Sequence, residues 1–234
     1  MGQNIAGPYR REAVANITHV FWEKPTNEKP CYIYSYVNGA FRELNNLIYV
    51  EIPVVTGNIN QNADYIGRFL LGNHCFYRCK NLFNSVKITE AKKQEFIYNI
   101  TYFGNQCFAQ IAPENGQDIP AVLFLNNASV AINPNAEQLG GSVFKESPVK
   151  EIIFGASDAP CMTATFGTLI FSNTGWGTKK RAFYEDGYNQ TRVIFYYSPE
   201  IAAGYASIDD YKANLEAKFY ITIDDNDFIQ AQGG

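Results

Sequence analysis

The sequence contains two histidines, His19 and His74, so chemistry that depends on a histidine acid or base has only these two candidates. Neither lies in a nucleophile motif, and the pattern G-x-S-x-G is absent from the chain. His19 stands between Thr18 and Val20 in an apolar segment, which favours a position on a sheet surface or a hydrogen-bonded place in the interior. These residues predict a protein that is not an enzyme.

One group of residues has the chemistry of a metal site. His74, Cys75 and Cys79 lie close in the chain, and Cys107 would join them if the two segments stack. Zinc takes four nitrogen or sulfur ligands in a tetrahedron, commonly from cysteines separated by two residues, and the spacing here is a loose match. The favoured prediction is buried, unreactive cysteines with no bound metal and no cofactor.

The same region contains a short internal repeat. The sequence GNHCF at 72–76 returns as GNQCF at 104–108, while the flanking residues match poorly. A shared unit of one turn and one strand would explain the match, but a repeat architecture needs at least three units, and only two copies stand out.

Acidic residues offer two further kinds of chemistry. Asp224, Asp225 and Asp227 supply the oxygen ligands that calcium prefers, but the segment lacks the glycine and terminal glutamate of an EF-hand, which favours a solvated turn. A hydrolase that pairs carboxylates from distant strands stays open as a third possibility, because such a pair leaves no local pattern. Glycine-rich phosphate-binding motifs are absent from the sequence.

Aromatic residues in polar surroundings are the best candidates for binding. Trp176 lies between Gly175 and Gly177, where a large ring has no core to fill, so its partner is a sugar ring, another subunit or the protein's own surface. Tyrosine suits interfaces because it combines apolar area with a hydroxyl. The candidate binding or interface residues are Trp176, Tyr188, Lys179, Lys180, Arg181, Tyr32, Tyr34 and Tyr36.

Composition narrows the possible partners. Charged residues make up 18% of the 234 residues, against about 25% in ordinary domains, and aromatic residues reach 15%. The net charge of −4 gives no reason to expect direct binding to nucleic acid. An odd number of cysteines, five, predicts reduced thiols. The chain shows neither a membrane-spanning run nor a signal peptide, so we expect synthesis in the cytoplasm.

The segments that must position these residues are predicted mainly as strands. Apolar and alternating segments at 13–22, 31–37 and 47–55 predict strands, and Asn38-Gly39 predicts a hairpin with a return strand from Ala40. Further strands are predicted at 96–103, 106–111, 121–132, 149–154, 161–171 and 219–223, and at 181–185 and 188–198 on either side of a hairpin turn at Asp186-Gly187.

Two short helices complete the predicted pattern. Thr89 can cap a helix through TEAKKQEF, and Ser207 with Asp210 resembles a capping box that opens a helix to about Leu215. We therefore expect an all-β, mainly antiparallel fold, a sandwich like a jelly roll or a barrel, with one or two short helices. An N-terminal arm at 1–12 would precede a single β-rich domain at 13–234.

These observations favour recognition over catalysis. The first hypothesis is a non-enzymatic structural subunit of a larger assembly, a viral or bacteriophage particle, located in the virion and contacting copies of itself and other subunits. The alternative is a carbohydrate-binding, lectin-like β-sandwich that grips a glycan with loop aromatics and polar side chains.

Overall fold

The computed structural model describes residues 16–23, 26–29, 33–53, 68–83, 89–111, 129–145, 147, 149, 151–170 and 191–232. The predicted arm at 1–12 and the first residues of the predicted domain lie outside these ranges. No helix in the described part of the chain is long and apolar enough to cross a membrane.

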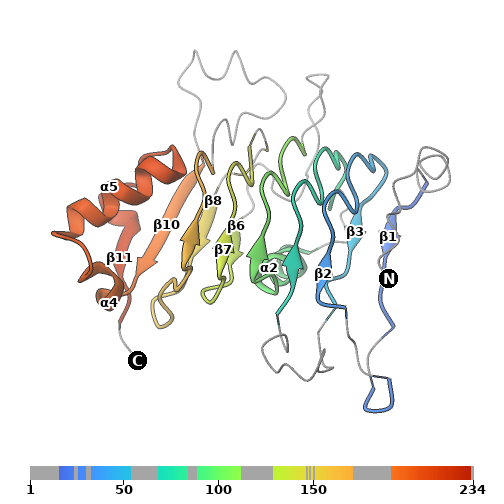
Figure 1. Cartoon of the computed structure of the whole chain (residues 1–234), viewed down its shortest axis with the longest axis horizontal. Helices are drawn as coiled ribbons and strands as arrows, with labels where there is room; N and C mark the ends of the chain where they lie inside the picture. The colour runs from blue at the N-terminus through green and yellow to red at the C-terminus, as the bar shows by residue number, and fades with distance from the viewer. Residues whose placement is uncertain are drawn as a thin grey trace.

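The chain winds as a solenoid whose strands all pair in parallel (Figure 1). Most successive strands lie in alternate rows, so a strand usually bonds to a strand of the same row one coil away. In two cases, strands that follow one another in sequence share a row and pair directly. One row forms a five-stranded sheet in the order β2 (Ser35–Tyr36), β4 (Leu70–Leu71), β5 (Tyr102–Phe103), β7 (Gln138–Leu139), β9 (Thr165–Phe166).

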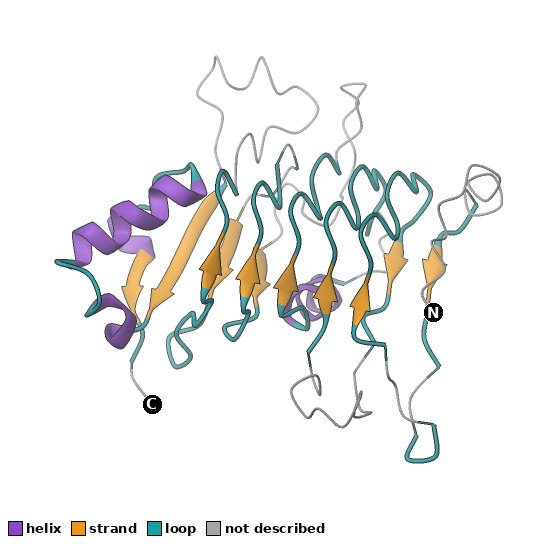
Figure 2. Ribbon diagram, viewed as in Figure 1, coloured by secondary structure: helices purple, strands orange, loops and turns teal. Residues whose placement is uncertain are grey.

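The second row runs behind the first (Figure 2). It contains a four-stranded sheet and a separate pair, β1 with β3. The four-stranded sheet has the order β11 (Phe228–Gln230), β10 (Arg192–Tyr197), β8 (Glu151–Phe154), β6 (Ser129–Ile132), and the pair joins β1 (His19–Val20) to β3 (Tyr49–Val50).

This architecture corrects the predicted fold class. The sheets are entirely parallel and a few short helices accompany them, so the fold is a mixed α/β arrangement and not an antiparallel sandwich, jelly roll or barrel. The hairpin predicted at Asn38-Gly39 is also wrong. Gly39 has the expected positive φ of 65°, but its N–H bonds to the carbonyl of Asn73 in the next coil, and no strand returns from Ala40. The turn is a corner of the solenoid.

The repeat seen in the sequence marks these corners. The segments 72–76 and 104–108 follow β4 and β5, which pair directly. The equivalent segments after β2 and β7 are VNGAF at 37–41 and GGSVF at 140–144, so within the described residues the complete unit occurs in four stacked coils and not two. Their phenylalanines are buried and nearly parallel, with ring centroids 5.1, 5.4 and 5.7 Å apart along the series Phe41, Phe76, Phe108, Phe144.

Helices complete the solenoid. α2 (Glu90–Tyr98) begins after Thr89 as predicted, and packs beside β6 in the second row. α4 (Pro199–Ala202) and α5 (Ile208–Phe219) follow β10, and Ser207 caps α5 by accepting a hydrogen bond from the N–H of Asp210 at 3.0 Å.

The strand predicted at 219–223 is absent, because Phe219 ends α5 and Tyr220 takes a left-handed conformation with φ 59°. Helix α5 covers the last coil. Phe219 is buried and stacks on Phe154 with ring centroids 5.1 Å apart, and Tyr211 and Leu215 are buried on the same helix. A terminal element of this kind protects the apolar end of a solenoid from water. The 3-10 turn η3 (Asp225–Asp227) then leads into β11.

Candidate recognition face

The five-stranded sheet presents one row of side chains to the outside. Register pairs place Ser35, Leu70, Tyr102, Gln138 and Thr165 side by side, each the first residue of its two-residue strand. Successive side chains of a strand point to opposite faces, and the second residues point inward. Four of these inward residues are buried in the core: Tyr36, Leu71, Phe103 and Leu139.

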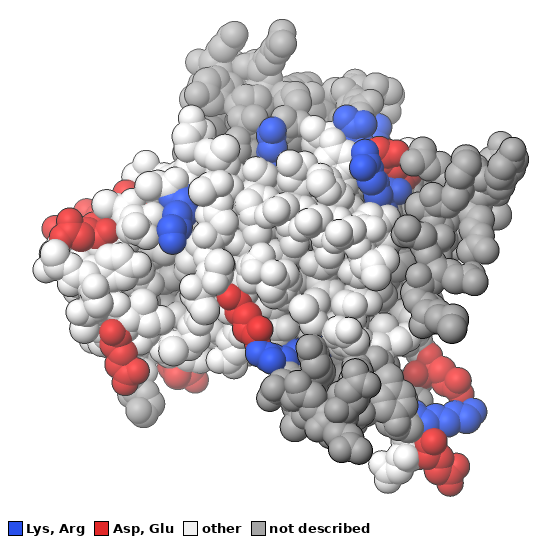
Figure 3. All heavy atoms as spheres, viewed as in Figure 1, with Lys and Arg blue, Asp and Glu red and all other residues white. Residues whose placement is uncertain are grey.

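We call the outward set the outer row. Neighbouring strands lie about 4.8 Å apart, so five strands give a row about 19 Å long. Its members are aliphatic, aromatic, amide or hydroxyl side chains, and none is charged. Figure 3 shows the corresponding face without Lys, Arg, Asp or Glu across its middle, with charged groups at the margins. At one margin Arg68 forms an ion pair with Glu137.

Glycines hold the coils at close distance beside this row. A Cβ atom added to Gly72 would lie 2.5 Å from the backbone nitrogen of Asn38 in the preceding coil, and one added to Gly104 would lie 2.5 Å from the carbonyl carbon of Gly72. The same position is Gly140 and Gly167 in the next two coils, with contacts of 2.7 and 2.3 Å. Any larger residue would push the coils apart, which fixes the spacing of the outer row.

Asparagine side chains link the same corners. The Oδ1 atom of Asn38 accepts a hydrogen bond from the N–H of Asn73 at 2.8 Å, and Asn73 repeats this with Asn105 at 2.8 Å. Asn105 in turn accepts from the N–H of Gly141 at 2.7 Å. We call this series the asparagine ladder. It satisfies backbone groups that the corners leave without a sheet partner, so it makes the edge of the face rigid.

Most of the predicted binding residues lie outside the described part of the chain: Trp176, Tyr188, Lys179, Lys180, Arg181 and Tyr32. Tyr34 is half-buried and packs against the core. Tyr36 points inward, and its hydroxyl donates to the carbonyl of Glu51 at 2.6 Å and accepts from the Nε1–H of Trp22 at 2.6 Å. Tyr36 therefore supports the core, and the described structure does not bring it to the surface.

The cysteines of the proposed metal cluster do come together. Cys75 and Cys107 occupy equivalent corner positions in adjacent coils, and both are buried with Cys79. Burial raises the pKa of all three thiols well above the ordinary value, which makes them poor ligands and poor nucleophiles. The ring of His74 instead packs edge-on against Tyr77, with ring centroids 5.5 Å apart. Within the described ranges, no group of three potential ligands is placed to hold a metal ion.

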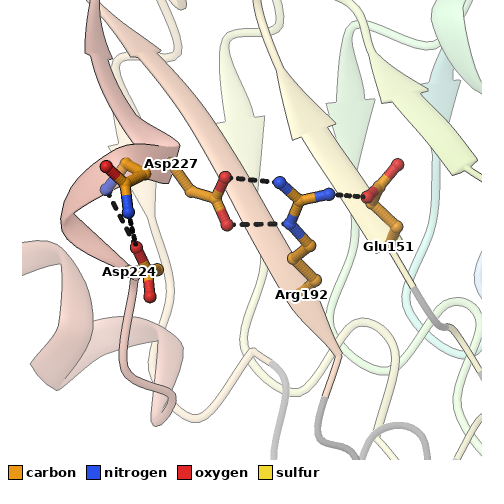
Figure 4. Close-up of polar contacts among 5 residues, drawn as sticks. Glu151, Arg192, Asp224 and Asp227 are labelled. Atoms are coloured by element: carbon orange, nitrogen blue, oxygen red, sulfur yellow. Dashed lines mark hydrogen bonds and ion pairs between the residues drawn. The ribbon is translucent and has the colours of Figure 1, made fainter.

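A second polar cluster lies on the four-stranded sheet (Figure 4). Arg192 binds both carboxylate oxygens of Asp227 at 2.8 and 2.7 Å and Glu151 at 2.9 Å, and these contacts raise the pKa of the guanidinium. Asp224 caps the η3 turn, and Asp225 pairs with Lys212, which lowers the pKa of its carboxyl. The acidic segment thus forms a turn that Asp227 fastens to the sheet and Asp225 fastens to α5.

Sequence reasoning missed the outer row because each member looks ordinary in its own segment. The useful signal was an apolar residue followed by a residue that is glycine in three of four copies, three further residues and phenylalanine, a pattern that ends at Phe41, Phe76, Phe108 and Phe144. Aligning those four segments places Ser35, Leu70, Tyr102 and Gln138 at one position.

Comparison with known proteins gives no relative. No protein family, no curated protein and no solved structure matches this chain.

Proposed function

We propose that this chain is a non-enzymatic binding protein that uses the outer row of the five-stranded sheet to contact other protein chains. The observation that carries the proposal is the continuous, uncharged row from Ser35 to Thr165 on a face whose coils are locked by glycines and asparagines. A surface that is already ordered loses little conformational entropy when it binds.

The chemistry of the row suits a protein contact. Leu70 and Tyr102 at adjacent positions provide apolar area, while Ser35, Gln138 and Thr165 provide polar groups toward the ends. Interfaces are typically depleted of charge at the centre and enriched in aromatic residues, and solenoid proteins commonly use an extended face for binding.

The partner is a copy of this chain or a different protein. Subunit contacts in a virion were predicted from composition together with an analogy to sandwich folds, and that analogy no longer applies. Assembly into a viral or bacteriophage particle stays a prediction. Native mass of the purified protein, measured by light scattering, separates self-contact from contact with another protein, because only self-contact raises the mass above 26.3 kDa.

Peptide display on the native, immobilised protein tests the proposal itself. Peptides selected from a random twelve-residue library should bind the outer row, so Leu70→Lys should weaken them about tenfold or more by placing a charge in a contact. Ile208→Lys makes the same change at an aliphatic side chain that is 45% exposed on α5, and should leave affinity unchanged. Equal effects of the two substitutions would refute the proposed site.

A further inference from the structure

The corners that follow β2, β4, β5 and β7 form a second surface, which borders the outer row. Their backbones align through equivalent hydrogen bonds. The N–H groups of Glu43, Arg78 and Gln110 donate to the carbonyls of Tyr77, Ala109 and Lys145 in the next coil at 2.8, 3.0 and 2.8 Å. The residue before each donor therefore occupies one position along the edge, which we call the corner row: Arg42, Tyr77, Ala109, Lys145.

The cations at the two ends of the corner row are available to a ligand. The side chain of Arg42 is 49% exposed, and its one hydrogen bond or ion pair with a described residue joins Nε to the carboxylate of Glu43 at 3.3 Å. Neither the terminal amino groups of Arg42 nor the ammonium group of Lys145 has a hydrogen-bond or ion-pair partner within the described residues. Figure 3 shows basic side chains gathered at this upper margin of the uncharged face.

The middle of the corner row is already ordered. The guanidinium carbon of Arg42 lies 5.2 Å from the centre of the Tyr77 ring, and that of Arg78 lies 5.1 Å from it. The Tyr77 hydroxyl and the Nε of Arg78 both donate to Oε1 of Gln110, at 2.8 and 2.7 Å. Cation–π contacts and these hydrogen bonds hold Arg42 beside the ring, so little entropy is lost when it meets an anion.

The spacing of the cations indicates the form of the ligand. Arg42 and Lys145 are three coils apart, which corresponds to about 14 Å at the usual strand separation. An extended peptide advances about 3.4 Å per residue, so residues four positions apart are about 14 Å apart and point to the same side. Two carboxylates with this separation would match the two cations.

We infer that the corner row recognises an acidic, extended protein segment that carries two Asp or Glu residues four positions apart and lies beside the outer row. This inference rests on the proposed function, because the same partner would contact both surfaces. The carboxylate of Glu43 offsets part of the positive charge of Arg42. A ligand carboxylate therefore has to bind the terminal amino groups of Arg42, which Glu43 does not contact. Because the chain has a net charge of −4, the attraction is local to this edge.

The display experiment described above tests this inference through the sequences and affinities of the selected peptides. Acidic residues four positions apart should be enriched, and a purified peptide should bind Arg42→Gln and Lys145→Gln about threefold more weakly each, and the double variant about tenfold more weakly. Glu43→Gln should strengthen binding about threefold. Lys29→Gln is the matched control, since it removes one exposed cation away from the corner row and should have no effect.

The outcomes separate the two proposals. Loss of affinity in Leu70→Lys without any loss in Arg42→Gln or Lys145→Gln overturns the inference and leaves the proposed function standing. Loss in the corner-row variants without loss in Leu70→Lys places the acidic peptide on the corner row alone, which overturns both the outer row as the site and the part of the inference that places the segment beside it. Binding of dextran sulfate, but of no acidic peptide, would identify a general polyanion site and overturn the inference.

Discussion

Asn105 shows how a single side chain supports the candidate site. Its Oδ1 accepts the N–H of Gly141 from the next coil, while its own N–H donates to Asn73. Asn105→Ala removes the side-chain oxygen that accepts this hydrogen bond, so the N–H of Gly141 loses its partner in the ladder. We expect a loss of about 1–2 kcal/mol in the free energy of unfolding, measured by urea denaturation. Asn99→Ala, at an exposed residue after α2, should cost less than about 0.5 kcal/mol. Equal losses in the two variants would show that this hydrogen bond of the asparagine ladder does not stabilise the fold.

Arg192 matters for a different reason, because it neutralises a carboxylate that the fold has buried. The side chain of Asp227 is 9% exposed and accepts two hydrogen bonds from Arg192. Arg192→Met should cost about 2 kcal/mol by leaving that carboxylate unpaired, which corresponds to about 4–8 °C in Tm. In an Asp227→Asn background the same substitution should cost much less, since the charge is gone. Thermal denaturation of the four proteins checks this, and strictly additive losses would contradict the pairing.

The corner as an element depends on glycine where the coils touch. Gly104→Ala would place a Cβ 2.5 Å from the backbone of the preceding coil, and backbone atoms cannot move aside as a flexible side chain could. We expect a loss of about 3 kcal/mol in the free energy of unfolding. Gly204→Ala is the control, since its nearest contact would be 3.2 Å from the carbonyl oxygen of Ile201. A loss below 1 kcal/mol for Gly104→Ala would show that the coils are not this close.

Because of the buried cysteines at the corners, we expect the free energy of unfolding to fall at alkaline pH. Burial raises the pKa of Cys75, Cys79 and Cys107 in the folded protein, while in the unfolded chain thiols ionise near pH 8.5. Below that pH both states keep the protons, and no stability is lost. Above it the unfolded state releases protons that the folded state retains, so each thiol should cost up to about 1.4 kcal/mol per pH unit.

Urea denaturation between pH 8 and 9.5 measures this decline. Cys107→Val provides the comparison, because Val143 occupies the equivalent position one coil later. The variant should show a shallower fall of stability with pH. An identical slope in both proteins would mean that the Cys107 thiol does not contribute.

At the scale of the whole molecule, the sequence predicted where many strands lie but not which strands pair with each other. The segments predicted as strands at 31–37, 47–55, 149–154 and 161–171 contain β2, β3, β8 and β9. Their partner strands lie one coil away, and the residues paired in register are between 22 and 41 positions apart in the sequence. The alternation of apolar and polar residues is the same in an antiparallel strand and in a short strand of a solenoid. This pattern therefore cannot identify the strand with which a segment pairs.

The candidate site was less predictable than the strands. Its residues belong to separate coils, and only stacking brings Leu70 beside Tyr102. The short repeat at 72–76 and 104–108 was the local trace of that stacking, because at these two corners the coils touch at a glycine and an asparagine side chain bonds to the next coil. The two further copies match less well, which hid the period: VNGAF keeps the asparagine and the phenylalanine, and GGSVF keeps the first glycine and the phenylalanine.

The recognition role of the outer row is the central claim. Tyr102 lies at the middle of the row, where an interface concentrates its binding energy. The most direct measurement is the dissociation constant of a selected peptide for Tyr102→Ala, compared with Tyr98→Ala, which removes a ring that is 45% exposed on α2. We predict about a tenfold loss of affinity for Tyr102→Ala and less than a twofold loss for Tyr98→Ala. Unchanged affinity in Tyr102→Ala would contradict the account.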